Sequence, residues 1–274
     1  PDRLLVIGGG YIATEFAGIF NGLGSQVTQL YRGDLFMRGF DGDIRAFAAE
    51  EIRKTGVDLR FNTNIESLTP ISDGYEATLT DGSTLVVDTV LCATGRHPNI
   101  EGLGLEHTKV TLDSRGYVKA NAQFQTEEPS VFALGDMTGG PQLTPVAIAQ
   151  AMAFAHTQFG SRPKTMDYEF IPTAVFCQPN IGTVGLTEEA ARDLGLELGI
   201  FKSDFKPMKH TLSGRDERTL MKLIVDKSTD RVIGLHMVGP DAGWDGRISA
   251  DFRWLRLWIL WHKLAGDRTC GGAG

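Results

Sequence analysis

The sequence has few of the features that mark membrane, secreted or nucleic-acid-binding proteins. It contains no run of about 18 apolar residues and no recognisable signal peptide, so we expect no membrane partner and a cytoplasmic setting. The net charge is −7, and no cluster of lysine or arginine offsets it. This balance argues against nucleic acid as the main partner.

Cysteine and metal-ligand pairs are also scarce. Cys92, Cys177 and Cys270 are far apart and form neither a C-x-x-C motif nor a metal-ligand spacing. Because Cys92 and Cys177 adjoin apolar runs, we expect both to be small core residues rather than redox groups. The six histidines are scattered without a ligand pair. The sequence therefore predicts no metal site.

What the sequence does contain is typical of a glycine-rich α/β protein. Of its 274 residues, 42% are hydrophobic, 22% are charged and 33 are glycine. This length can bury one large core or two ordinary ones. We expect a globular fold rather than a disordered or fibrous chain.

The stretch 6–17 reads as a short apolar strand that runs through a glycine turn into a helix. Gly8 permits the sharp turn, Gly10 removes a side chain that would block a pyrophosphate, and Ala13 lets helix and strand approach closely. The N–H groups at the start of such a helix face an anion. The stretch predicts a dinucleotide site, although an ordinary strand-to-helix turn would look similar.

The end of the next predicted strand, 26–31, indicates which dinucleotide is bound. A site for NAD would carry an acidic residue there. This chain instead has Arg32 directly after the strand and Arg38 six residues further on. Two guanidinium groups suit the 2′-phosphate of NADPH. The alternative is a pair of solvated surface arginines.

Strands and helices alternate up to residue 93, which predicts a parallel sheet with right-handed crossovers. Short strands joined by turn residues interrupt this alternation and predict an antiparallel excursion. The predicted parallel strands are 4–8, 26–31, 57–61 and 88–95, the helices are 11–23 and 42–55, and the short strands are 65–68, 75–79 and 85–87.

The middle of the chain has little predicted regular structure before a strand at 130–134 and a helix at 144–158. Thr144 is expected to cap this helix, with Pro145 in its first turn. Asp136 follows the strand, where a carboxylate can accept hydrogen bonds from sugar or ribityl hydroxyls or else cap the next turn. From residue 167, several strands and a helix at 188–194 capped by Thr187 predict an α+β module.

Several motifs resemble those of the flavoprotein pyridine nucleotide-disulfide oxidoreductases. They keep the order and spacing of that family over residues 1–243, and the loop 32–38 with the stretch 209–215 is most similar to its glutathione reductase branch. The motifs are Gly8–Glu15, Ala93–Arg96, Ala133–Asp136 and Leu143–Ala147.

The resemblance implies a homodimer in which NADPH reduces FAD, FAD reduces a dithiol, and the dithiol reduces glutathione disulfide. It places Ala174 near the nicotinamide, Asp136 at the FAD ribityl chain and Thr144 at the flavin ring. The remaining residues that it assigns to the NADPH site are Gly8, Gly10, Tyr11, Ile12, Ala13, Glu15, Arg32, Arg38 and Gly95.

The resemblance also implies three domains followed by a tail. Residues 1–93 form the NADPH-binding domain, 94–162 a returning segment of the FAD domain, and 163–243 an incomplete dimerisation domain. All four tryptophans lie in residues 244–274. We expect this tail not to belong to the fold and to result from a shifted reading frame. The alternative is an amphipathic helix at 252–264.

The family's first FAD-binding glycine motif, its redox cysteine pair and its catalytic His and Glu have no counterpart in this sequence. We therefore assign no catalytic residue and expect only part of the FAD site. By itself the chain is expected to be inactive. Two rival functions stay open: another NADPH-dependent disulfide or mercuric-ion reductase, and a non-catalytic NADPH-binding or dimerisation module.

Overall fold

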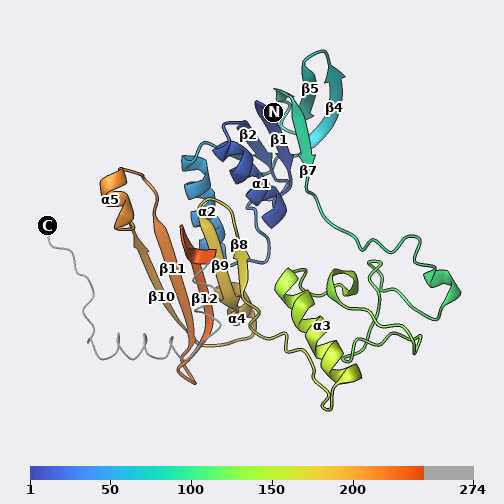
Figure 1. The fold of residues 1–274 in the computed structure, drawn as a ribbon. Helices are drawn as coiled ribbons and strands as arrows, with labels where there is room; N and C mark the ends of the chain where they lie inside the picture. The colour runs from blue at the N-terminus through green and yellow to red at the C-terminus, as the bar shows by residue number, and fades with distance from the viewer. Residues whose placement is uncertain (244–274) are drawn as a thin grey trace. The chain divides into compact units, whose positions relative to one another are not determined.

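The computed structural model describes residues 1–243, and these form two compact units (Figure 1). The first unit combines residues 1–94 with the chain from Phe170 onward, and the second comprises residues 95–169. The expectations for 244–274, a foreign tail or a helix at 252–264, lie outside the described residues. None of the helices within 1–243 is long and apolar enough to cross a membrane.

The N-terminal part of the first unit contains the predicted parallel sheet. Its strand order is β3-β2-β1-β7, and every neighbouring pair is parallel. Alternate residues of β1 face opposite layers: Leu4 and Val6 pack with helix residues, whereas Leu5 and Ile7 pack against a smaller sheet. The elements are β1 (Arg3–Ile7), α1 (Tyr11–Gly22), β2 (Gln26–Leu30), α2 (Gly42–Lys54), β3 (Asp58–Arg60) and β7 (Thr89–Cys92).

The smaller sheet is the predicted antiparallel excursion. It has three strands in the order β4-β5-β6, and Ala77, Leu79 and Val87 from it bury the second face of β1. Its strands are β4 (Ile65–Ile71), β5 (Gly74–Leu79) and β6 (Thr84–Val87).

The C-terminal part of the first unit is an antiparallel sheet in the order β10-β11-β12-β9-β8. Val175, Ile181, Leu220 and Val238 of this sheet share one buried cluster with Ile44 of α2, so the two sheets have a common core. Thr187 caps α4 as predicted, because its side chain accepts the Ala190 N–H at 3.1 Å. The elements are β8 (Thr173–Val175), β9 (Asn180–Gly185), α4 (Glu188–Asp193), β10 (Leu198–Phe205), α5 (Lys209–Ser213), β11 (Thr219–Asp226) and β12 (Arg231–Gly239).

The second unit has little regular structure, and two details of its prediction were wrong. The expected strand at 130–134 makes a single bridge, Gln125↔Phe132. The pairing goes no further because the chain turns just before it, where the Phe124 N–H donates to Asn121 O at 2.9 Å, and a 3₁₀ turn begins at Gly135. Thr144 does not cap its helix; Leu143 is the N-cap and Thr144 is the first helical residue. The elements are the 3₁₀ turns η1 (Leu105–His107) and η2 (Gly135–Thr138) and the helix α3 (Thr144–Phe159).

The prediction for the cysteines was half right. Cys177 is buried, and its Sγ lies 3.0 Å from Pro179 O. Burial raises the pKa of this thiol to about 12, so it stays protonated at neutral pH. Cys92 is exposed instead, because it ends β7, an edge strand of the parallel sheet.

One buried ionic cluster joins the two parts of the first unit. Lys222 of β11 has a side chain that is 1% exposed, and its Nζ contacts three carboxylates: Asp41 at 2.9 Å, Asp43 at 2.6 Å and Glu188 at 2.7 Å. We call these four residues the Lys222 cluster. Two surface cations extend it, since Lys202 pairs with Asp43 and Arg192 with Glu188.

Within this cluster, the N-termini of α2 and α4 cap each other. Asp41 accepts the Asp43 N–H at the start of α2 and also the Glu188 N–H at the start of α4. In return, Glu189 of α4 accepts the Gly42 N–H at 3.0 Å. Carboxylates at both helix N-termini satisfy N–H groups that have no partner within their helix.

Removing the cation should destabilise the first unit. We expect Lys222→Met to cost about 3–5 kcal/mol at neutral pH, because it leaves the buried Asp41 carboxylate without its cation and removes one cation from the partly exposed Asp43 and Glu188. Lys202→Met removes a half-exposed lysine 3.3 Å from the same Asp43 and should cost at most about 1 kcal/mol. Thermal unfolding of both variants measures the difference; equal midpoints would contradict the prediction.

The thermal stability of the same two variants should respond differently to low pH. Burial alone would raise the pKa of Asp43, but the hydrogen bond and charge of Lys222 outweigh it and lower that pKa; Lys222 also lowers the pKa of Glu188. Their stabilisation is present above ordinary carboxyl pKa values near about 4 and is lost as pH falls through the lower folded values. We expect the midpoint of Lys222→Met to fall less than that of Lys202→Met on acidification.

Candidate functional site

The glycine turn after β1 has the geometry of a ligand-binding turn. Gly8 has φ +143°, and a Cβ there would lie 2.3 Å from Ala93 O. A Cβ on Gly9 would lie 2.3 Å from the Tyr31 ring, so both positions exclude side chains for internal reasons. Gly10 differs, because a Cβ there would meet no atom within 4 Å. The space beside Gly10 is therefore open to a ligand.

The start of α1 is arranged for an anion. Gly10 is the N-cap with φ −91°, no side chain caps the helix, and its first turn holds no acidic residue. A helix N-terminus carries a partial positive charge and N–H groups that point outward. Together with the space beside Gly10, this end of α1 fits a pyrophosphate.

A buried side-chain amide holds the glycine turn in place through hydrogen bonds. Gln29 of β2 is fully buried, and its Nε2 donates to Gly8 O at 3.0 Å and to Thr14 Oγ1 at 3.2 Å. Thr14 in turn donates to Gly10 O at 3.0 Å. Sequence reasoning missed this network, because β2 reads QVTQL and nothing in it marks Gln29 as the buried one.

The two arginines lie on a loop that is tied to the glycine turn. We call residues 31–41 the arginine loop; Arg32 and Arg38 are both exposed on it. Met37 N donates to Gly9 O at 2.6 Å. Arg45 of α2 donates to Phe36 O at 2.7 Å and also to Leu35 O, a contact that sequence reasoning missed. The loop therefore presents two cations close to the turn.

The structure also brings α1 next to β8. Glu15 of α1 accepts the Phe176 N–H at 2.8 Å, which holds the end of the strand that carries Ala174. Tyr11 and Ile12 are half-buried in the first turn of α1, whereas Ala13 is fully buried. Glycine turn, arginine loop, Glu15 and Ala174 thus all belong to the first unit.

The other predicted site residues, Gly95, Asp136 and Thr144, belong to the second unit. Asp136 lies in η2, is half-exposed and pairs with Arg96. Gln150 of α3 is buried and fixes this turn, because its Oε1 accepts the Gly135 N–H at 2.6 Å. Thr144 is exposed at the start of α3. A half-exposed carboxylate and an exposed hydroxyl fit the polar groups of a flavin cofactor.

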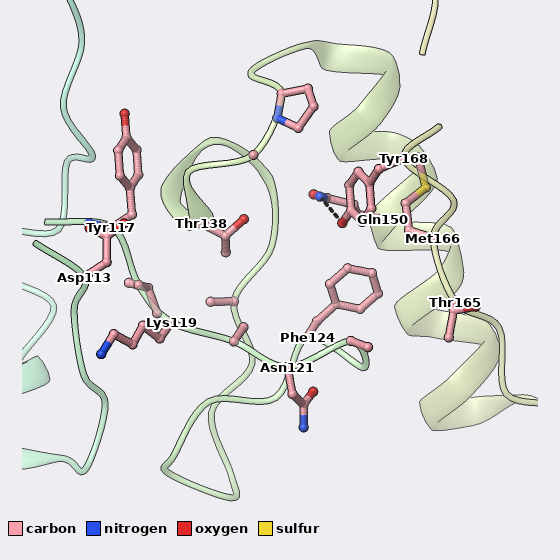
Figure 2. A pocket seen from close by; sticks show the side chains of 16 residues that line it. Asp113, Tyr117, Lys119, Asn121, Phe124, Thr138, Gln150, Thr165, Met166 and Tyr168 are labelled. Carbon is pink, nitrogen blue, oxygen red and sulfur yellow. Dashed lines mark hydrogen bonds between the residues drawn. The ribbon is translucent and has the colours of Figure 1, made fainter. Parts of the chain in front are cut away.

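The second unit also contains a cavity of about 700 Å³ (Figure 2). Figure 2 shows the hydrogen bond from Gln150 to the Tyr168 hydroxyl beside it, which measures 2.8 Å. Neither Asp136 nor Thr144 lines this cavity. The cavity therefore does not mark the place of the predicted flavin contacts. No group of His, Cys, Asp and Glu within residues 1–243 could hold a metal ion.

The fold and the glycine turn define a Rossmann-like α/β protein with an added antiparallel sheet. The sequence profile described as pyridine nucleotide-disulphide oxidoreductase matches residues 1–151, and the profile of that family's dimerisation domain matches residues 171–249. The chain therefore belongs to the pyridine nucleotide-disulphide oxidoreductase family, as the motifs predicted.

Its relatives include glutathione reductases. The chain is 47% identical over 242 residues to the glutathione reductase of Burkholderia cepacia, covering 88% of this chain and 54% of that protein. It is 42% identical to the Nostoc sp. glutathione reductase, covering 88% of this chain and 56% of the relative. The chain thus spans about half the length of these curated relatives.

Solved structures agree with this assignment. The HOCl-induced flavoprotein disulfide reductase RclA from Escherichia coli matches with a TM-score of 0.84 and 29% identity. The match covers 92% of this chain and 58% of that one. The α/β architecture is therefore that of flavoprotein disulfide reductases.

Two alanine substitutions separate the folding role of this turn from its binding role. Gly8→Ala should destabilise the chain by more than about 2 kcal/mol, because the new methyl group meets Ala93 O and the backbone is strained. Gly10→Ala should leave the thermal midpoint nearly unchanged but weaken dinucleotide binding at least about tenfold, since its methyl group enters the ligand space. Calorimetric titration and thermal unfolding distinguish the two. Tight dinucleotide binding by Gly10→Ala would contradict the assignment.

Proposed function

We propose that this chain is the nicotinamide-binding and dimerisation part of an NADPH-dependent glutathione-disulfide reductase. The observation that carries the proposal is the arginine loop, which presents Arg32 and Arg38 beside an uncapped helix N-terminus. The identity of 47% to a glutathione reductase supports the choice of substrate. The match to a dimerisation domain supports a homodimer.

In this proposal the residues of the first unit bind and orient NADPH. The N-terminus of α1 and the space at Gly10 take the pyrophosphate, and Arg32 and Arg38 take the 2′-phosphate as charge-assisted hydrogen-bond donors. Glu15 already accepts the Phe176 N–H, and its second carboxylate oxygen can accept from the nicotinamide carboxamide. Ala174, on the neighbouring strand, limits the space beside the ring.

The second unit contributes to an FAD site. Asp136 would accept hydrogen bonds from ribityl hydroxyls and Thr144 would contact the flavin ring. Gly95, the first residue of this unit, stays assigned to NADPH by the family resemblance. When bound, NADPH supplies a hydride and FAD passes the electrons to a disulfide. The role of Gln150 is to fix the turn that holds Asp136.

The wild-type chain should prefer NADPH to NADH at least about tenfold, and Arg32→Ala/Arg38→Ala should lose most of this preference, since each charge-assisted contact contributes about 1.5–3 kcal/mol. Calorimetric titration with both cofactors measures it. Arg231→Ala, at an exposed arginine of β12, is the control and should keep the wild-type preference. Equal affinities in the wild type would disprove the cofactor assignment.

A chimera tests the disulfide substrate. Residues 1–243 would replace the matched segment of the Burkholderia cepacia glutathione reductase. We expect a yellow protein whose flavin is bleached faster by NADPH than by NADH and which turns over glutathione disulfide. Trypanothione disulfide and mercuric ion serve as rival substrates. A chimera that binds FAD but is bleached equally by both cofactors would count against the proposed function.

A further inference from the structure

The two halves of the arginine loop have different anchors. At its start, Asn62 N donates to Gly33 O at 2.9 Å and Thr63 N donates to Tyr31 O at 3.2 Å, so the chain after β3 holds the part that carries Arg32. Asp41 is the last residue of the loop, three residues after Arg38, and it is fully buried in the Lys222 cluster. The antiparallel sheet therefore holds one end of the arginine loop, through Lys222 of β11.

From this arrangement we propose that Lys222 is a positioning residue for Arg38 and thereby sets the preference of the protein for NADPH over NADH. The inference rests on the proposed function, because it assumes that Arg38 contacts the 2′-phosphate. Lys222 itself touches no cofactor in this proposal. It acts through Asp41 and the backbone between residues 38 and 41.

The charges of the cluster explain why Asp41 depends on Lys222. Asp43 and Glu188 are partly exposed, at 37% and 22%, and they have further cationic partners in Lys202 and Arg192. Asp41 is 0% exposed, and it forms its ion pair with Lys222. Without that ammonium, Asp41 keeps the Asp43 and Glu188 N–H groups as donors but faces two other carboxylates with no cation between them. Outward movement of Asp41 relieves this repulsion.

Such a movement would displace residues 38–41, while the Met37 N–H keeps its bond to Gly9 O and holds the earlier part of the loop to the glycine turn. The glycine turn and the N-terminus of α1 are supported by Gln29 and Thr14, which lie outside the cluster. NADPH and NADH differ only by the 2′-phosphate, so a displaced Arg38 weakens NADPH alone. Loss of preference with unchanged NADH affinity is therefore the signature of positioning, whereas general unfolding weakens both cofactors.

The test measures the dissociation constants of NADPH and NADH for the full chain and for Lys222→Met. We expect the NADPH preference to fall at least about fivefold while NADH affinity stays constant. The matched control is Lys202→Met, which removes the half-exposed lysine on Asp43 and should leave the preference unchanged.

Combination with the arginine variants identifies the route. In an Arg38→Ala background, Lys222→Met should cause no further loss of preference, whereas in an Arg32→Ala background it should still cause one. Asp41→Ser is the second variant, because serine can still cap α2 but is too short to keep the contact with Lys222. Asp41→Ser takes the place of Lys222→Met in the test if Lys222→Met loses NADH binding and circular dichroism shows that Lys222→Met has not folded.

The outcomes separate the two proposals. A wild type that binds both cofactors equally would overturn the proposed cofactor and this inference together. A wild type that prefers NADPH, with the same preference in a folded Lys222→Met or Asp41→Ser variant, would overturn this inference alone. A selective loss that is additive with Arg38→Ala would also overturn it, since the effect would then not pass through Arg38.

Discussion

The first unit depends on one buried ammonium. Lys222 lies in an antiparallel strand, yet its three carboxylate partners come from the start of α2 and the start of α4. A buried cation is costly unless it is paired, and each buried carboxylate is equally costly without it. The cluster therefore places a directional contact, as well as apolar burial, where the antiparallel sheet meets α2. The shared apolar core that contains Ile44 and Val238 supplies the burial around it.

Because α2 is fixed at its N-terminus, the features that lead into it are fixed as well. The arginine loop runs from β2 to Asp41, and Arg45 on the first turns of α2 holds the carbonyl oxygens of Leu35 and Phe36. Met37 ties the same loop to Gly9. These contacts hold the backbone of the loop, and under the proposed function they reduce the ordering that binding through the two exposed arginines must bring about.

The glycine turn shows how the same residue type meets two demands. Gly8 is required by the fold, since its neighbour Ala93 O leaves no space for a Cβ. Gly10 is not required by the fold, because its conformation and surroundings would accept alanine. A glycine that the structure does not need is an indication of a ligand. The position of each glycine in the motif predicted this difference, and the structure adds the steric reason for Gly8.

The sequence by itself determined the local order of this protein: the strand-turn-helix of residues 3–22, the parallel alternation, the antiparallel excursion and the Thr187 cap follow from short-range patterns of apolar and turn residues. The family also followed from motifs that lie within single segments. Only the tertiary structure decided the rest. The strand expected at 130–134 did not form a ladder, and Cys92 is exposed because β7 is an edge strand. The partners of Lys222 are 34 to 181 residues away along the chain. Such pairings depend on which elements pack together, and side-chain periodicity carries no information about distances of that kind.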